Sequence, residues 1–183
     1  MNVNSIFKHA LLEMDEDPAD ISDYDEKFKM YLNMGYQLIV RKYYKPRETV
    51  VVRTDKEGYL NLYGYNVEEI VAMQTVDGRP VTYEVHPDGR NEYQTSARGQ
   101  KVAVVYVTSY PPLVDELDEP NLPEHVHYAL VNYICYKHLS SGNLAKQSRA
   151  QYYLQSFYEA MGMLKPTGSG SVKTYTNFYA ATE

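Results

Sequence analysis

The sequence predicts an α+β protein, in which helices from both ends of the chain form a bundle and an antiparallel β-sheet subdomain is inserted between them. Hydrophobic residues recur at helical spacing before residue 46 and after residue 123. Between these parts, apolar and polar residues alternate with the period of two that is typical of strands. A Gly/Ser-rich stretch, residues 167–171, then separates a C-terminal arm from the bundle.

Residues 1–46 are expected to supply the N-terminal helices of the bundle. The first helix is predicted over 4–14, and its apolar face contains Ile6, Ala10, Leu11 and Met14. After an acidic stretch, Ser22 is the predicted N-cap of a longer helix, with Asp25 three residues later as in a capping box. We expect this second helix to run to about Tyr43, because Pro46 disfavours its continuation.

Residues 47–110 are expected to form the antiparallel β insert. Short runs rich in β-branched residues and Tyr are separated by turns, an organisation typical of a sandwich or a barrel-like sheet. The expected strands are 49–54, 59–63, 67–76, 81–86, 92–95 and 101–108. Asp77 and Gly78 stand between two of these runs and form a strong β-hairpin signal.

Residues 111–166 are expected to complete the bundle with an αα-hairpin. Two amphipathic segments, 124–140 and 143–164, are separated by a short Ser-Gly-Asn link, so they should pack as antiparallel neighbours. Residues 167–183 are then expected to form a flexible arm, disordered in the free protein and extended when bound. The arm's candidate partner-binding residues are Val172, Tyr175, Phe178 and Tyr179, which lie in a segment that alternates like a strand.

The composition excludes several classes of protein. The single cysteine, Cys135, rules out an internal disulfide framework and suits a reducing compartment. A net charge of −6 disfavours a protein that coats nucleic acid, which needs clustered Lys and Arg. No apolar run approaches the roughly 20 residues of a membrane span, and the N-terminus lacks the pattern of a signal peptide. No membrane association is therefore expected.

Tyrosine is unusually frequent, with 20 Tyr against 4 Phe and no Trp. Its large ring and polar hydroxyl suit protein interfaces, although the same properties also suit a core whose edges meet water. Composition alone leaves both alternatives open. The candidate subunit-interface residues are Tyr31, Tyr133, Tyr153, Phe157 and Tyr158.

No catalytic, metal or cofactor site is predicted. The acidic stretch 15–26 has carboxylates at several positions of a calcium-binding loop, but Asp20 occupies the position that requires Gly. His125 and His127 are two residues apart, so on a helix their side chains diverge. In mid-helix, Cys135 is expected to be a small buried hydrophobe.

The C-terminal cassette resembles that of the head-to-tail connector (adaptor) proteins of tailed bacteriophages, especially the tail tubular proteins of short-tailed phages. The similarity begins at Leu122-Pro123-Glu124-His125, continues through Tyr133 and Gly142, and ends with a helix from Ala145 through Tyr158. With the N-terminal helices and the β insert, it extends over most of residues 4–164.

The resemblance implies a structural virion protein rather than an enzyme, and no catalytic residue is carried over. It implies a ring of identical subunits, usually twelve, in the virion neck between head and tail after assembly in the host cytoplasm. The implied partners are the portal protein and a tail or nozzle protein, with DNA passing through the lumen during ejection. A ring of acidic subunits would repel phosphate and let DNA slide. The alternative is a Tyr-rich protein- or carbohydrate-binding β module with helical flanks; a small enzyme is disfavoured because no polar set converges.

Overall fold

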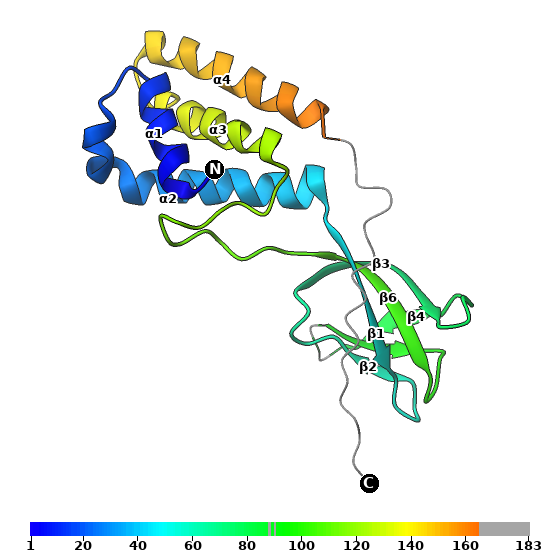
Figure 1. Ribbon diagram of the computed structural model, residues 1–183. Coiled ribbons are helices and arrows are strands. Elements are labelled where there is room, and N and C mark those ends of the chain that lie inside the picture. The colour runs from blue at the N-terminus through cyan, green and yellow to red at the C-terminus, as the bar shows by residue number, and fades with distance from the viewer. Residues whose placement is uncertain (88, 90, 165–183) are drawn as a thin grey trace. The chain divides into compact units, whose positions relative to one another are not determined.

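The computed structural model describes residues 1–87, 89 and 91–164, and its architecture confirms the predicted α+β class (Figure 1). These residues divide into two compact units. Residues 1–45 and 110–164 form the helical unit, and residues 46–109 form the β unit. The predicted arm, residues 167–183, lies outside the described residues.

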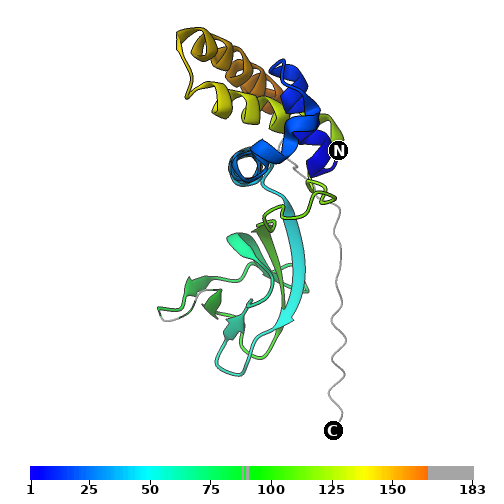
Figure 2. The ribbon, with the colours of Figure 1, turned by 90° about the vertical axis from the view of Figure 1, so that its left-hand side faces the viewer.

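Four helices build the helical unit: α1 (Val3–Glu13), α2 (Ile21–Leu38), α3 (His127–Leu139) and α4 (Leu144–Gly162). Helix α3 contacts each of the other three and lies between α2 and α4 (Figures 1 and 2). Asn143 caps α4, because its side chain accepts a hydrogen bond from the backbone N–H of Lys146 at 3.1 Å. The predicted αα-hairpin is therefore present, joined by the short link that contains Gly142.

Helix α3 is buried on several faces, whereas the sequence pattern predicted an amphipathic segment over 124–140. The segment starts with a 3₁₀ turn, Glu124–Val126, and continues as α3. The buried residues of α3 are His127, Ala129, Leu130, Val131, Asn132, Tyr133, Ile134, Cys135 and Leu139. The difference arises because a helix with neighbours on three sides buries more than one stripe, and an almost continuous apolar run is the signature of that position.

Helices α2 and α3 approach each other closely at Gly35. A Cβ atom at this position would lie 2.8 Å from Cδ1 of Tyr133, closer than real Cβ contacts allow. The Tyr133 ring is only 7% exposed and packs against Phe157, with 5.2 Å between ring centroids. Because the ring is held from the other side, the absence of a side chain at Gly35 sets the spacing of the two helices.

The start of α2 differs from the prediction. Asp17 caps a 3₁₀ turn, Pro18–Asp20, by accepting a hydrogen bond from the N–H of Ala19 at 2.9 Å, and this turn runs directly into α2. Ser22 therefore lies inside the first turn of α2 and does not cap it. At its other end, α2 continues as a π-helix, Ile39–Tyr44, and terminates at Lys45, whose φ of 42° is left-handed.

The connecting segment 110–122 is attached to α2 by polar side chains. Asn33 donates to the Leu113 carbonyl at 2.9 Å and accepts from the Leu113 N–H at 2.8 Å. One turn later, Gln37 donates to the Tyr110 carbonyl at 3.0 Å, and the buried Tyr36 hydroxyl accepts from the N–H of Asn121. These bonds satisfy backbone groups in a segment that has no regular secondary structure.

The β unit consists of two three-stranded antiparallel sheets. The first has the order β1 (Arg47–Arg53), β6 (Lys101–Thr108), β3 (Val67–Thr75), and the second has the order β2 (Tyr59–Asn61), β5 (Glu92–Thr95), β4 (Tyr83–Val85). Both sheets contribute to one core, which contains Val50, Leu60, Leu62, Met73, Val81, Tyr93, Ala97, Val102, Val104 and Tyr106. The predicted antiparallel insert is thus confirmed as two small sheets that share a core.

Asp77 and Gly78 lie in a tight turn after β3. The Gly78 N–H donates to the Thr75 carbonyl at 2.9 Å, and Gly78 has a φ of 81°, which favours glycine. The returning chain pairs with β3 only as far as Val81, whose N–H donates to the Met73 carbonyl. The predicted strand 81–86 shortens to β4 and pairs with β5 in the second sheet, because the long partner of β3 is β6.

Gly35→Ala should destabilise the protein, since the added methyl group meets a ring that cannot move freely. Overpacking of this kind costs about 1–3 kcal/mol, which outweighs the gain of about 1 kcal/mol in helix propensity. Thermal unfolding should show a melting temperature several degrees lower. Gly162→Ala is the matched control, because no described atom lies within 4 Å of a Cβ there, and its melting temperature should be unchanged or higher. Equal melting temperatures for Gly35→Ala and the wild type would contradict the close packing.

Acid should destabilise the helical unit through His138. Its Nδ1 atom is buried without a hydrogen-bond partner among the described residues, and its ring contacts those of Tyr24 and Phe28. Burial, followed by the positive charges of Lys27 and Lys146, lowers the pKa of His138 below its ordinary 6.5. The unfolded chain therefore binds the proton more readily, so the unfolding free energy should fall as pH drops below about 6.5.

Urea unfolding at several pH values tests this linkage. The His138→Gln variant should lack the part of the pH dependence that His138 causes. Above pH 7, where His138 is neutral in both states, the difference in unfolding free energy between the variant and the wild type should no longer change with pH. Parallel pH profiles for the two proteins between pH 5 and 7 would show that His138 does not contribute.

Candidate interaction surfaces

The described residues contain no group of three or more His, Cys, Asp or Glu side chains placed to hold a metal ion. His127 is buried, and its Nε2 lies 3.0 Å from the Leu122 carbonyl, whereas His125 is exposed in the preceding 3₁₀ turn. The two imidazoles therefore do not converge. Cys135 is also buried, and burial raises its pKa to about 12, which keeps the thiol protonated and unreactive at neutral pH.

The acidic stretch 15–26 does not form a calcium-binding loop. Its middle is the 3₁₀ turn Pro18–Asp20, and its last part is already in α2. Asp23 and Glu26 consequently project from a helix, where they cannot wrap around an ion with Asp15 and Asp17. Asp15 instead forms an ion pair with Arg149, with 3.0 Å between Oδ2 of Asp15 and Nη2 of Arg149.

The C-terminal end of α1 is attached to α4. The Glu13 carbonyl accepts hydrogen bonds from the Tyr153 hydroxyl at 2.6 Å and from Nη2 of Arg149 at 3.1 Å. Carbonyl groups at a helix C-terminus lack intrahelical partners, and a cation is favoured there by the helix dipole. Tyr153, 5% exposed, is therefore an internal link between helices.

The five residues predicted to lie in a subunit interface fall into two groups. Phe157 is fully buried, and Tyr133 and Tyr153 are nearly so, which makes these three part of the subunit's own core. Their rings fill space within the chain, and a role for them in a subunit interface stays a prediction. Tyr31 is half-buried, and Tyr158 is 51% exposed, so these two remain candidates for contact with another molecule.

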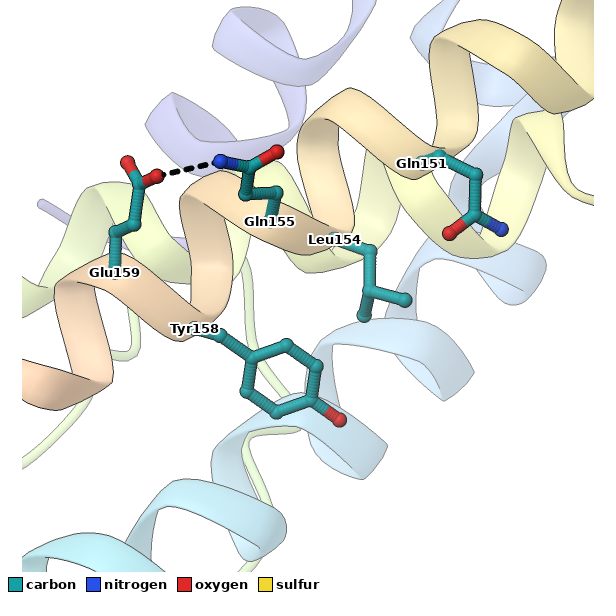
Figure 3. A pocket seen from close by; sticks show the side chains of 5 residues that line it. All are labelled: Gln151, Leu154, Gln155, Tyr158 and Glu159. Atoms are coloured by element: carbon teal, nitrogen blue, oxygen red, sulfur yellow. Dashed lines mark hydrogen bonds between the residues drawn. The ribbon is translucent and has the colours of Figure 1, made fainter.

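The outer side of α4 presents the first candidate surface. No charged residue occurs from Ala150 to Tyr158, although much of this stretch is exposed. We call the side chains that line a shallow depression on this helix the α4 surface, which consists of Gln151, Leu154, Gln155, Tyr158 and Glu159 (Figure 3). Leu154 and Tyr158 project toward the same side of the helix in Figure 3. Aromatic enrichment and depletion of charge are the compositional signs of the centre of a protein interface.

The position of Tyr158 is fixed from beneath by buried aromatic rings. Its ring is 5.5 Å from that of Phe157, which in turn packs on Tyr133. Burial, followed by the neighbouring Tyr136 and Tyr158 hydroxyls, raises the pKa of Tyr133. A ring supported in this way loses little side-chain entropy when a partner covers it, which favours its use in an interface.

The outer side of α2 presents a second candidate surface, which the sequence reasoning missed. Met30 is 54% exposed and Met34 is 44% exposed, and the exposed carboxylates of Asp23 and Glu26 precede them on the helix. We call these four residues the α2 surface. The signal in the sequence was the spacing of four residues between the two methionines, on the side opposite the buried stripe that contains Phe28.

The β unit also has exposed apolar side chains. Tyr63 is 83% exposed, Val76 64% and Val85 65%. They lie after β2, in the turn that precedes Asp77, and on β4, respectively. The arm residues predicted to bind a partner, Val172, Tyr175, Phe178 and Tyr179, lie outside the described residues.

Comparison with known protein families finds a match that spans most of the chain. No curated protein matches the sequence. In the described part of the chain, no helix is both long enough and apolar enough to cross a membrane. The family model of the SU10 adaptor protein matches residues 1–176, which takes in both units. The chain therefore belongs to the SU10 adaptor protein family, a family of bacteriophage head-to-tail adaptors.

Proposed function

We propose that this protein is a structural component of the virion neck, which forms a ring below the portal and joins it to the tail. The family match over residues 1–176 is the observation that carries the proposal. The partners are other copies of the chain, twelve in a complete ring, together with the portal protein and a tail or nozzle protein. The role is architectural and not catalytic, and assembly takes place in the host cytoplasm.

The negative charge of the chain supports the proposal that DNA passes through the lumen of the ring as cargo. The net charge is −6, and eight carboxylate residues lie between positions 13 and 26 of the helical unit. A ring multiplies this charge by the number of its subunits. Negative potential near a channel repels the DNA backbone, so the nucleic acid moves through without adsorbing to the wall.

The exposed apolar side chains support assembly with other protein chains. On α4 these include Leu144 at 82% exposure and Tyr152 at 69%, in addition to Tyr158. Large apolar side chains at such exposures are unfavourable in water, and burying them in an interface releases about 25 cal/mol per Å². The α4 and α2 surfaces are therefore proposed to be covered in the assembled neck.

Electron microscopy of the purified protein mixed with the portal protein of its phage tests the proposal. We expect class averages of a ring stacked on one end of the portal, since the adaptor connects the portal to the tail. An unrelated acidic protein of similar size serves as the control for adventitious stacking. A compact monomer without affinity for the portal would contradict the proposal and would favour the alternative, a Tyr-rich binding module.

The arm is proposed to attach the ring to its neighbour. Residues 172–179 alternate like a strand, and such a segment can join the edge of a sheet on the portal or on an adjacent subunit. Deletion of 167–183 should weaken attachment to the portal at least tenfold and leave the melting temperature nearly unchanged. The linker variant Gly168→Ser with Gly170→Ser keeps all arm aromatics and should attach normally. Wild-type attachment by the truncated protein would show that the arm has no docking role.

A further inference from the structure

We propose that the outer edge of β1 accepts the C-terminal arm of a neighbouring subunit, so that residues 172–179 of one copy add a strand to the first sheet of the next. The inference rests on the ring of the proposed function and specifies a contact that links its subunits. An arm and a sheet edge are two different parts of the chain, so their contact is heterologous and can continue around a ring. The edge lies among the described residues, and the arm lies outside them.

Strand β1 lies at one edge of the first sheet, where β6 is its neighbour among the described strands (Figure 2). The pairing with β6 runs without a register shift over all seven residues of β1. The middle of the strand, residues 49–52, is Thr-Val-Val-Val and carries no charged side chain. A regular, uncharged edge presents a row of backbone groups to which a strand from another chain can bind.

The alternation of the antiparallel ladder identifies the backbone groups that face outward. At one end of β1, the Thr108 N–H donates to the Pro46 carbonyl at 3.0 Å. At the other end, the Thr54 N–H donates to the Gln100 carbonyl at 3.0 Å. Both pairs continue the β1–β6 register, so the even-numbered residues of β1 bond to β6, and the N–H and C=O groups of the odd-numbered residues point away from it. The odd-numbered residues are Arg47, Thr49, Val51 and Arg53.

These outward-facing groups have no backbone partner in the described part of the chain, because no backbone hydrogen bond outside the β1–β6 ladder involves residues 47–53. A strand placed beside β1 would pair with them directly. Main-chain hydrogen bonds of this kind supply the affinity when an extended segment joins a sheet.

The other edge strands of the two sheets are protected. Outside β3, the returning chain forms two hydrogen bonds, in which Thr75 N–H donates to the Arg79 carbonyl and Val81 N–H donates to the Met73 carbonyl. Strand β3 also has two register shifts against β6. The edges of the second sheet, β2 and β4, have three residues each. Short strands, bulges and covering segments keep edges from pairing with other chains, and among the described edges β1 alone has none of these protections.

The sequence of the arm suits an added strand. Residues 172–179 number eight, which matches the seven residues of β1. Six of the eight are β-branched or aromatic, and Lys173 is the one charged residue among them. The Gly/Ser-rich stretch 167–171 precedes this segment and gives it the reach of a flexible linker.

Alternation also determines which face of the arm continues the core. On β1, Val50 is buried in the core of the β unit and Val52 packs against it. The arm face that extends this apolar surface is the one that does not carry Lys173, since a buried cation is unfavourable. This face consists of Val172, Thr174, Thr176 and Phe178. Tyr175 then lies on the same side of the sheet as Val51.

Proline at position 51 tests whether the edge is used. The Val51 N–H points away from β6, so Val51→Pro removes a donor from the outer edge and leaves the ladder intact, which is where sheets tolerate proline. Val51→Thr is the matched control, because it keeps the N–H and a β-branched side chain. On the portal, full-length Val51→Pro should form about tenfold fewer rings than the wild type, whereas Val51→Thr should form them normally. A wild-type yield of rings from Val51→Pro, shown to be folded by circular dichroism, would overturn the inference.

Disulfide trapping between copies provides a second measurement that does not depend on the proline variant. Full-length Val51→Cys is mixed with Tyr175→Cys or with Asn177→Cys, assembled on the portal, oxidised and separated on a non-reducing gel. Two arm positions are used because alternation determines the face of the arm but not its register. Phe178→Cys is the matched control, since it lies on the other face. The native Cys135 is buried, and its raised pKa of about 12 keeps it protonated.

We expect a covalent dimer from at least one of the first two mixtures and none from Val51→Cys with Phe178→Cys. Absence of a dimer from every mixture would overturn the inference. Equal yields with Phe178→Cys would also overturn it, because a loosely tethered arm has no preferred face. When both cysteines are placed in one chain, we expect covalent oligomers, and a bond closed only within single chains would show that the arm binds its own subunit.

These outcomes separate the inference from the proposed function. Wild-type rings on the portal, together with either of these failures, would contradict the β1–arm contact and leave the proposed function intact. Failure of the wild-type protein to form rings on the portal would contradict the proposed function, and this inference with it.

Discussion

The helical unit depends on the burial of α3, a helix that has neighbours on three sides. Residues such as Leu130 and Ile134 are completely buried, and each buried side chain of this size contributes about 1.5–3 kcal/mol. The close approach of α2 at Gly35 makes this burial possible on one side, and Phe157 of α4 completes it on another. Because α3 is covered by its own chain, the surfaces available to partners are those of the flanking helices α2 and α4.

In the same arrangement, some tyrosine side chains are buried and others are exposed. Buried rings such as Tyr36 and Tyr153 use their hydroxyl groups to hold backbone groups of the connecting segment and of α1. Exposed rings such as Tyr152 and Tyr158 lie on the outer side of α4. Composition left open whether the tyrosines lie in the core or at protein interfaces. The structure has tyrosines of both kinds, since some are buried and form polar links and others are exposed on the surface.

Periodicity and turn chemistry were sufficient to predict most of the elements. The helical stripes, the change to a period of two and the short Ser-Gly-Asn link depend on local spacing, which one sequence displays directly. The burial of α3 on several faces, the move of β4 to a second sheet and the burial of Phe157 depend on which elements become neighbours. These are tertiary properties, and the sequence pattern was not sufficient to predict them. Ser22 failed as a predicted cap for a related reason, because a 3₁₀ turn that begins at Pro18 competes for the same backbone groups.

Prediction of the candidate surfaces from the sequence was limited in the same way. Sequence reasoning named both Tyr158 and Phe157 as interface candidates, but it could not show that Tyr158 is exposed whereas Phe157, one position earlier, is buried. Met30 and Met34 escaped attention because methionine is common in cores, and only their exposure marks them as surface residues.

A cryo-electron microscopy map of the neck in intact virions would test the central claim most directly. The account predicts a ring of this chain below the portal, with the exposed side of α4 that carries Tyr158 covered by another protein chain. A neck without this chain, or a ring in which the outer sides of α2 and α4 both face solvent, would contradict it.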